Sequence, residues 1–448
     1  MKRSLIASIL GSCLIAPSAF AEVIDLKMWM RSDQNLSQME PTVIKAAESL
    51  NKELEAEGDE RRINVEMQLN RARGWDEDIL QYLRSNSVNR GADIYVGAHE
   101  WIASLAESDA VIPLDKEIEA NPHLFGDMVE WIWPTVTYKQ QRWGIPFLPE
   151  ARMVFFNKQM LRDIGKSNDY IESLSYKVDE GEFTIHDLSA LTKEVVEKSD
   201  VKYGMLHRPN TGPDFLMNMR SFGFEPQDPV SGKLVVNQKA LQDFLAWIET
   251  NANDNVTPRN NTSMSWDVVH RAFGEGDAFV KIHGIWGVPN MINMGISDNT
   301  EESYFENVGW MNVPSAVKGE KPYNMTHPLM MTVSPKASDK ELSVRLIGEI
   351  IKAENYTPLA TGAGFLAIHN QEEKSDAYQE AWISRSGSEL LASSEVMVMP
   401  IHPSLAKYND ILYRGIQAVE TGRLSSADGT KFIVERMNIE MSEDVTIQ

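Results

Sequence analysis

Cysteine is nearly absent from this sequence, since Cys13 is the only one in 448 residues. It falls in an N-terminal segment that we expect to be removed, which leaves the mature chain without a disulfide, a thiol nucleophile or a cysteine-ligated metal. The nine histidines show no ligand spacing, and His99-Glu100-Trp101 lacks the second histidine of a zinc HExxH motif. Walker A and GxSxG sequences are absent as well. We therefore expect no metal and no cofactor.

Positive charge is scarce, because 43 Lys and Arg residues face 65 Asp and Glu residues and give a formal net charge of −22 at pH 7. So acidic a chain is a poor partner for nucleic acid or anionic lipid. Repeats and low-complexity linkers are also missing. The hydrophobic content of 42% is typical of a globular protein, and the length exceeds one typical core, so we expect two lobes.

The N-terminus has the parts of a secretory signal. Lys2 and Arg3 precede an apolar segment at residues 5–16, and Ala19-Phe20-Ala21 places small residues where signal peptidase reads them. The apolar segment is too short to span a bilayer as a mature helix. Leu10-Gly11-Ser12-Cys13 loosely resembles a lipoprotein box, but cleavage there would leave a second apolar stretch at the mature terminus. We expect cleavage after Ala21 and a periplasmic protein.

Strand and helix patterns alternate along the first part of the mature chain. Residues 23–30, 63–69 and 92–96 are predicted to be strands, and residues 36–57 and 75–84 between them helices. Such alternation is typical of an α/β fold with a parallel sheet covered on both faces. Ligands of these sheets collect at the carboxyl ends of the strands.

One stretch in the middle of the chain departs from the ordinary pattern of a buried sheet. Strand-like runs at 143–147 and 153–156 are separated by Pro149, Glu150 and Arg152, where a buried strand would carry apolar residues. On local pattern alone the stretch is either a passage between two lobes or a surface loop.

The same stretch resembles a known family. Gly144-Ile145-Pro146, followed by an apolar run that ends in Phe156-Asn157-Lys158, is similar to the lobe-crossing segment of family 1 solute-binding proteins. These are periplasmic receptors of ABC importers, of the maltose-binding-protein type. In that family a glutamate seven residues before the asparagine faces the sugar, and Glu150 has that spacing to Asn157. The resemblance implies a periplasmic-binding-protein-like α/β fold with two discontinuous lobes, a ligand cleft and a hinge between them.

The resemblance extends along nearly the whole mature chain and implies its domain boundaries. Residues 1–21 would be the signal peptide. Lobe 1 would comprise residues 22–147 and about 315–370, and lobe 2 about 148–314 and 371–448. Lobes built from discontinuous segments explain why no linker is visible in the composition.

A second family landmark lies further along. Ala272-Phe273-x-x-Gly276-x7-Gly284-x-Trp286 matches the family pattern, in which the tryptophan stacks on a sugar ring. A pyranose shows a patch of C–H groups that loses water readily on an indole face, whereas its hydroxyls need fixed polar partners. Without the resemblance, Trp286 would be assigned to the core.

The third landmark is in the first lobe. There the family has Ala-His followed by a carboxylate and an arginine that hold sugar hydroxyls, and His99 is followed by Glu100 and Trp101. Glu100 matches the carboxylate, Trp101 replaces the arginine, and Gly97 stands where maltose-binding protein has a tryptophan. The alternative for Glu100 is an acid at the start of the helix that follows.

Near the first strand, Trp29-x3-Asp33-Gln34 resembles the family's first sugar-contacting loop, with Gln34 where a lysine is usual. Arg31, Arg152 and Arg208 are either surface arginines or replacement cations suited to an acidic sugar. In the C-terminal part, one more aromatic residue would face the cleft. The full set of implied ligand-binding residues is Glu150, Trp286, Glu100, Trp101, His99, Asp33, Gln34, Arg152 and Tyr408.

The resemblance implies a monomeric, non-enzymatic periplasmic binding protein. It would capture a sugar or sugar-like solute and deliver it to an inner-membrane ABC permease. One alternative is a secreted carbohydrate-active hydrolase that uses a carboxylate pair such as Glu100 and Glu150, held roughly 5–10 Å apart across one bond. Another is a solute receptor for chemotaxis or signalling.

Overall fold

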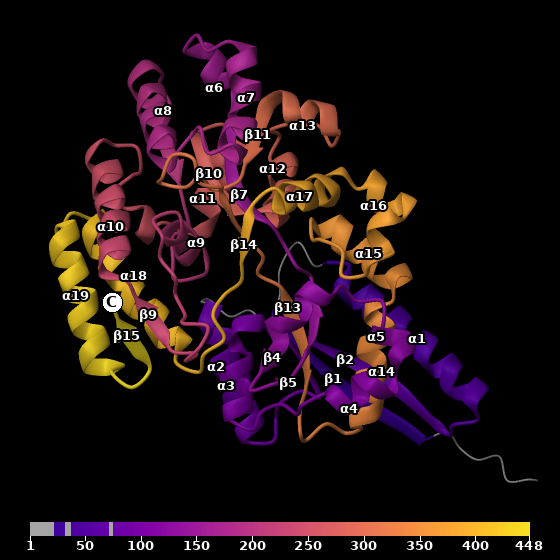
Figure 1. Ribbon diagram of the computed structural model, residues 1–448. Coiled ribbons are helices and arrows are strands. Elements are labelled where there is room, and N and C mark those ends of the chain that lie inside the picture. Colours follow the sequence, from indigo (N-terminus) through magenta and orange to yellow (C-terminus); the bar gives the residue numbers. More distant parts are fainter. Residues whose placement is uncertain (1–21, 32–36, 71–74) are drawn as a thin grey trace, which may run out of the picture.

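The computed structural model describes residues 22–31, 37–70 and 75–448. The predicted signal peptide at 1–21 lies outside these residues. Within them the chain forms two main β-sheets, each covered by helices and each in a separate body (Figure 1). We call the first sheet with its helices lobe 1, and the second sheet with its helices lobe 2.

Lobe 1 is built on a five-stranded sheet. Its strands are β1 (Glu22–Arg31), β2 (Arg61–Asn70), β3 (Ile94–Ala98), β6 (Ile145–Phe147) and β13 (Leu329–Val333). The order is β2-β1-β3-β13-β6, with β1 parallel to both β2 and β3 and with β13 antiparallel to both of its neighbours. The predicted parallel α/β pattern is therefore present, and residues 329–333 return to this sheet from a distant part of the chain.

Helices of lobe 1 cover this sheet because each presents an apolar stripe. In the longest of them, Val43, Ala46, Leu50 and Leu54 recur every three or four residues and are buried. Two of the helices meet end to end at Lys352, which leaves the helical conformation at ψ 135°. The helices are α1 (Met39–Glu57), α2 (Trp75–Ser87), α3 (Ile102–Glu107), α4 (Asp115–Ala120), α5 (Pro122–Phe125), α14 (Lys340–Ile351) and α15 (Ala353–Ala363).

Lobe 2 is built on a four-stranded sheet. Its strands are β7 (Arg152–Asn157), β8 (Tyr203–Leu206), β10 (Ala278–Gly284) and β11 (Val308–Met311), in the order β11-β7-β10-β8. β10 is antiparallel to β7 and parallel to β8, and all of its residues are buried. Polar side chains on this strand are therefore enclosed by the lobe.

The remaining helices and short strands complete lobe 2 and its edges. Helices α10, α18 and α19 form a bundle beside β9 and β15 at the left of Figure 1, and a two-stranded β4–β5 hairpin lies against lobe 1. Their bounds, in chain order, are β4 (Thr137–Tyr138), β5 (Gln141–Arg142), α6 (Lys158–Asp163), α7 (Asn168–Asp179), α8 (Ile185–Lys198), α9 (Asp214–Arg220), β9 (Leu234–Val236), α10 (Gln238–Asn253), α11 (Trp266–Gly274), α12 (Val288–Asn293), α13 (Glu301–Asn307), β12 (Tyr323–Met325), α16 (Asp376–Glu380), α17 (Trp382–Ala392), β14 (Glu395–Met397), α18 (Leu405–Glu420), α19 (Ser426–Glu440) and β15 (Val445–Ile447).

The chain passes between the two sheets at neighbouring points. β6 belongs to the first sheet and β7 to the second, so residues 148–151 make the first crossing, as the prolines predict. A second crossing runs from β11 to β13 through β12, which pairs in parallel with β14. The backbone N–H of Leu366 donates to the carbonyl of Pro149 (2.8 Å), which ties a third segment to the first crossing. The lobe boundaries given above stay a prediction.

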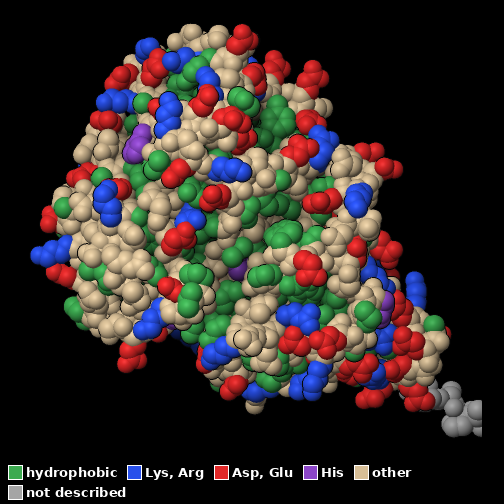
Figure 2. All heavy atoms as spheres, in the orientation of Figure 1, with side chains coloured by type: hydrophobic (Ala, Val, Ile, Leu, Met, Phe, Trp, Pro, Cys, Tyr) green, Lys and Arg blue, Asp and Glu red, His purple; other side chains and the backbone are tan. Residues whose placement is uncertain are grey.

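The surface agrees with this arrangement. Figure 2 shows acidic and basic side chains spread over both bodies, while hydrophobic side chains gather in a band across the middle of the visible face. A search of the described residues for a helix long and apolar enough to cross a membrane finds none.

Candidate functional site

A cavity of about 330 Å³ lies where the crossings meet, with walls from both lobes. Lobe 1 contributes the carboxyl ends of β1 and β3, the edge at which parallel sheets collect ligands. The loop before α9 and the start of α11 form the opposite wall, and the crossings supply the floor. Such a volume lies at the small end of the range for ligand pockets.

Four residues of the predicted set line this cavity: Glu150, Arg152, Trp286 and Trp101. Glu100 lies beside it instead, in the wall of an adjacent pocket of about 210 Å³ that also borders Trp101. The structure thus brings together residues that are up to 185 positions apart, counted from Trp101 to Trp286.

Two predicted residues do not reach the cavity. Tyr408 is fully buried in the core of lobe 2, and its hydroxyl donates to the carbonyl of Val235, so the prediction that it faces the cleft is wrong. His99 is also fully buried, and its Nδ1 lies 3.0 Å from the carbonyl of Pro328. Burial lowers the pKa of His99 to about 4, which keeps the ring neutral. Asp33 and Gln34 lie outside the described residues.

Glu150 is the central carboxylate of the cavity floor. Arg152 Nη2 donates to its Oε1 (2.5 Å), while Oε2 is buried and has no hydrogen-bond partner among the described residues. Burial raises the pKa of Glu150, and the charge of Arg152 opposes that rise. The ion pair fixes one oxygen and leaves the other as an acceptor beside the cavity.

A second carboxylate joins two arginines behind the floor. Arg152 Nη1 donates to Asp214, and Arg208 Nη1 donates to Asp214 Oδ2 (3.2 Å). Burial would raise the pKa of Asp214, but both guanidinium groups outweigh it, and the pKa is lowered. Arg208 Nε also donates to the carbonyls of Asn210 and Thr211 (3.1 and 3.0 Å), so the loop before α9 is wrapped around this side chain.

His327, on the second crossing, connects this network to lobe 1. Its Nε2 lies 2.8 Å from Glu100 Oε2, and its Nδ1 lies 3.7 Å from Glu150 Oε1. His99, Glu100 and His327 form the only cluster among the described residues that could hold a metal ion, with ligand atoms within 4.8 Å of one another. Hydrogen bonds hold the members of this cluster in place: His327 Nε2 lies 2.8 Å from Glu100 Oε2, and His99 Nδ1 lies 3.0 Å from the carbonyl oxygen of Pro328.

Aromatic rings form the wall of lobe 2. Ser265 caps α11 by accepting from the backbone N–H of Val268, and residues four apart on a helix share a face, which places Trp266 and His270 side by side. Their ring centroids are 5.0 Å apart with planes at 16°. Arg208 also packs on Trp266, with Cζ 5.2 Å from the ring centroid. Trp286 follows β10 in a short 3-10 turn and completes the wall.

The sequence profile of the bacterial extracellular solute-binding proteins matches residues 47–356 of this chain. The chain belongs to this family. The resemblance to family 1 solute-binding proteins is thereby confirmed. Membership establishes an extracellular solute-binding protein and leaves the solute open.

Curated relatives of this solute-binding protein are distant. A maltotriose-binding protein of Pyrococcus abyssi is 21% identical over 213 residues, which are 47% of this chain and 41% of the relative. A binding protein of Brucella abortus is 20% identical over 380 residues, which are 84% of this chain and 85% of the relative. The match therefore spans less than half of the Pyrococcus abyssi protein and most of the Brucella abortus one.

Solved structures share the whole fold. A maltose-bound protein of T. maritima superposes with a TM-score of 0.73 at 16% identity, covering 93% of this chain and 99% of that one. The GacH receptor of Streptomyces glaucescens, solved unliganded and with acarbose, gives a TM-score of 0.76 at 14% identity, covering 94% and 99%. At such identities the likeness establishes the two-lobed fold.

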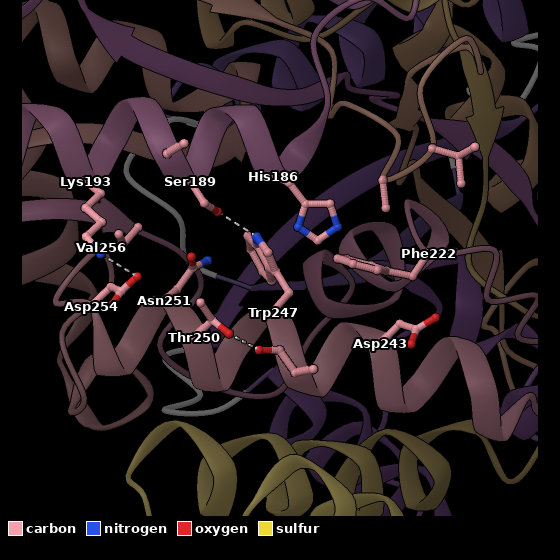
Figure 3. Close-up of a pocket in the computed structure, with 14 residues that line it drawn as sticks. His186, Ser189, Lys193, Phe222, Asp243, Trp247, Thr250, Asn251, Asp254 and Val256 are labelled. Carbon is pink, nitrogen blue, oxygen red and sulfur yellow. Dashed lines mark hydrogen bonds and ion pairs between the residues drawn. The ribbon is translucent and has the colours of Figure 1, made fainter.

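This solute-binding protein also has a larger hollow, of about 560 Å³, between α8 and α10 (Figure 3). Trp247 Nε1 donates to Ser189 Oγ (2.8 Å) across it, and Lys193 pairs with Asp254 (3.0 Å) at one end. All of its lining residues lie between 186 and 317, and none belongs to the sheet or the helices of lobe 1. Closure of the lobes does not act on this hollow, so the cavity at the crossings is the better candidate.

Sequence reasoning missed several residues of the cavity wall, among them Trp266, His270 and His327. The first two carried a signal, because a capping serine followed by aromatic side chains four residues apart predicts one shared helix face. No sequence signal identified His327, because its position depends on where the second crossing meets the first.

Proposed function

We propose that this protein binds a sugar in the cavity between its lobes and delivers it to an ABC permease of the inner membrane. It does so as a monomeric periplasmic protein exported by the segment at 1–21, and it performs no catalysis. Family membership supports the proposal, as do the sugars named for relatives of the same fold: maltose, maltotriose and acarbose. Closure around the ligand follows from walls that belong to different lobes.

One observation carries the choice of a sugar: the cavity holds polar atoms that lack partners. Glu150 Oε2, Arg152 Nε and Asn210 Oδ1 belong to cavity residues, and each atom is buried without a hydrogen bond among the described residues. A buried polar group left unpaired costs about 1–3 kcal/mol, so folded proteins rarely keep several together without a reason. Sugar hydroxyls both donate and accept, and can therefore satisfy two acceptors and one donor at once.

Binding rather than hydrolysis fits the carboxylates. A glycosidase needs two carboxyl groups that face the same bond. Of the pair considered above, only Glu150 lines the cavity, whereas Glu100 accepts from His327 in the adjacent wall. Asp78, another acid of the cavity, already accepts from Trp29 Nε1 (3.2 Å) and from the hydroxyl of Tyr95 (3.0 Å). Asp267 of α11 is the third acid among the lining residues, and the incubation experiment below tests whether it acts with Glu150 as a hydrolytic pair.

Thermal denaturation with a sugar panel tests the proposal. The panel contains maltose, maltotriose, mannotriose, tagatose and acarbose, the solutes named for relatives of the same fold. A sugar at 100 times its dissociation constant should stabilise the protein by about 2.7 kcal/mol. Days of incubation should leave that sugar unchanged by chromatography. A shift with amino acids or peptides and with no sugar would overturn the proposal.

Glu150→Ala should weaken binding of the best panel sugar by about 10- to 150-fold. The reason is that hydrogen bonds to a charged group contribute roughly 1.5–3 kcal/mol. Calorimetric titration measures the loss. Glu48→Ala removes an exposed carboxylate from α1 and should leave the affinity unchanged. Equal affinity of a folded Glu150→Ala variant and the wild type would remove Glu150 from the site.

Trp286→Ala should weaken binding by a little under 100-fold. If an indole face of roughly 100 Å² loses water on binding, at about 25 cal/mol per Å², the contact contributes about 2.5 kcal/mol. Trp131→Ala, on an exposed tryptophan, is the matched control and should change nothing. A Trp286→Ala variant that loses apo stability in denaturant melts while it keeps the wild-type affinity would make Trp286 a packing residue.

A further inference from the structure

A lysine lies fully buried in the central strand of lobe 2. Lys281 has no exposed surface, and its strand neighbours are Phe155 on β7 and Leu206 on β8. Among the described residues no carboxylate lies within 4 Å of its amine, and its one hydrogen-bond partner is His270 Nδ1 (2.9 Å). Burying an amine without a counter-charge is costly, so this lysine calls for a reason other than stability.

The partner of this lysine reaches the ligand cavity. His270 comes from α11, its ring stacks on Trp266, and it lines the cavity beside Trp286. Lys281 therefore lies behind the cavity wall, separated from the cavity by the side chain of His270. The lysine approaches His270 at Nδ1, which leaves Nε2 on the far side of the ring from the amine.

Hydrogen-bond chemistry fixes the state of this histidine. An ammonium group has three donors and no acceptor, so His270 Nδ1 must accept. A neutral imidazole that accepts at Nδ1 carries its proton on Nε2. We propose that Lys281 holds His270 as an Nε2–H donor on the cavity wall, where it binds an acceptor oxygen of the solute.

This inference rests on the proposed function and narrows the solute class. The neighbouring floor offers an acceptor, Glu150 Oε2, whereas the wall at His270 offers a donor backed by a cation. A hydroxyl, a ring or glycosidic oxygen, or a carboxylate fits that wall. An ammonium group does not, because it has no lone pair to offer and is repelled by Lys281. The site therefore selects neutral or acidic sugars and excludes amino sugars protonated at that position.

The charges on the pair agree with the geometry. Burial lowers the pKa of Lys281 to about 7, so the ammonium form predominates at pH 6. Burial and the nearby Lys281 lower the pKa of His270 to about 3, so its ring is neutral at the same pH. His283, the other imidazole of this region, lies 2.9 Å from the carbonyl of Gly284 through its Nδ1 and does not replace His270 as the partner.

Nitrogen NMR of ¹⁵N-histidine-labelled, sugar-free protein at pH 6 tests the tautomer. The His270 signals are assigned by their loss in His270→Phe. We expect a protonated Nε2 and an unprotonated Nδ1 in the wild type. In Lys281→Met the two nitrogens should approach the averaged shifts of an exchanging imidazole, while Lys45→Met, an exposed lysine of α1, should leave them unchanged. A doubly protonated ring, or a proton on Nδ1, in the wild type would overturn the inference whether or not the variants fold.

Calorimetric titration tests whether His270 contributes to binding. The probe is maltotriose if the sugar panel shows that it binds, and otherwise the panel sugar that gives the largest thermal shift. His270→Phe keeps the ring stacking but has no donor, and should weaken binding by about 2- to 12-fold. His270→Gln places an amide donor near Nε2 and should recover most of the loss. Equal affinity of His270→Phe and the wild type would overturn the binding role. A protein that has the expected tautomer but binds no panel sugar would instead refute the proposed function alone.

Discussion

Arg152→Met is expected to lower the free energy of unfolding by about 3–5 kcal/mol. Arg152, which is 4% exposed, pairs with two carboxylates, and Glu150 and Asp214 are each 2% exposed. Asp214 keeps Arg208 in the variant, but the one basic group that Glu150 keeps among the described residues is His327, at 3.7 Å. A buried carboxylate without its cation is among the most destabilising changes in a protein core. Urea denaturation of the sugar-free protein at pH 7 measures the loss.

The double variant Arg152→Met with Glu150→Gln provides the control for this prediction. Because the neutral amide carries no charge to compensate, most of the lost stability should return. Burial already raises the pKa of Glu150, and the single variant should raise it further, so its deficit should shrink as the pH falls and Glu150 takes up a proton. A folded single variant that loses less than about 1 kcal/mol would show that the pair is not desolvated as described.

Lys281→Met is expected to stabilise the protein, by an amount that depends on pH. The pKa of Lys281 is about 7 in the folded chain, against an ordinary value of 10.5. Between these values the unfolded chain binds a proton that the folded chain does not, so wild-type stability from this group rises with pH. Below about pH 7 the full penalty applies, on the order of 4–5 kcal/mol at 1.36 kcal/mol per pKa unit. Denaturant melts at pH 6 and pH 10 measure the difference.

The gain from Lys281→Met should therefore be largest at pH 6 and should almost vanish near pH 10.5. Other titrating groups contribute equally to the variant and the wild type, so the difference isolates Lys281. Lys45→Met on the surface of α1 should change stability little at either pH. A destabilised Lys281→Met variant at pH 6, or a gain independent of pH, would contradict the burial of an unpaired amine.

Local pattern predicted most of the architecture. Apolar periodicity fixed the types of β1, α1, β2, α2 and β3, and the structure moves their ends by only a few residues. Prolines flanking two strand-like runs located the first crossing, because proline cannot continue a central ladder. The second crossing includes a short strand, β12, that local pattern does not reveal, because the residues it pairs with on β14 lie 72 positions later in the chain.

The site was predicted in part, for physical reasons that differ between residues. Trp286 and Glu150 were named from the family resemblance, which is carried by their spacing to glycines and to an asparagine, and both line the cavity. Tyr408 was misplaced because it lies on the amphipathic helix α18, where a small error of register exchanges the cleft-facing and core-facing sides. His99 adjoins the cavity residues in sequence, but its side chain turns into the core.

The buried ion network was beyond sequence reasoning. Arg152 and Asp214 are 62 residues apart, and neither position shows locally that the two will meet. Lys281 did give a signal, since a charged residue within the apolar run Ala278–Gly284 predicts a buried amine that needs a partner. Its partner, His270, lies 11 residues away on a helix, and the sequence does not show which face of that helix packs on the strand. Only the structure identifies the pair.

A crystal structure of the protein grown with its best panel sugar tests the central claim most directly. We predict one sugar in the cavity at the crossings, with a hydroxyl within hydrogen-bond distance of Glu150 Oε2 and a ring against Trp286. A sugar bound outside this cavity, in the hollow between α8 and α10 for example, would contradict the account. A solute of another class occupying the cavity would contradict it as well.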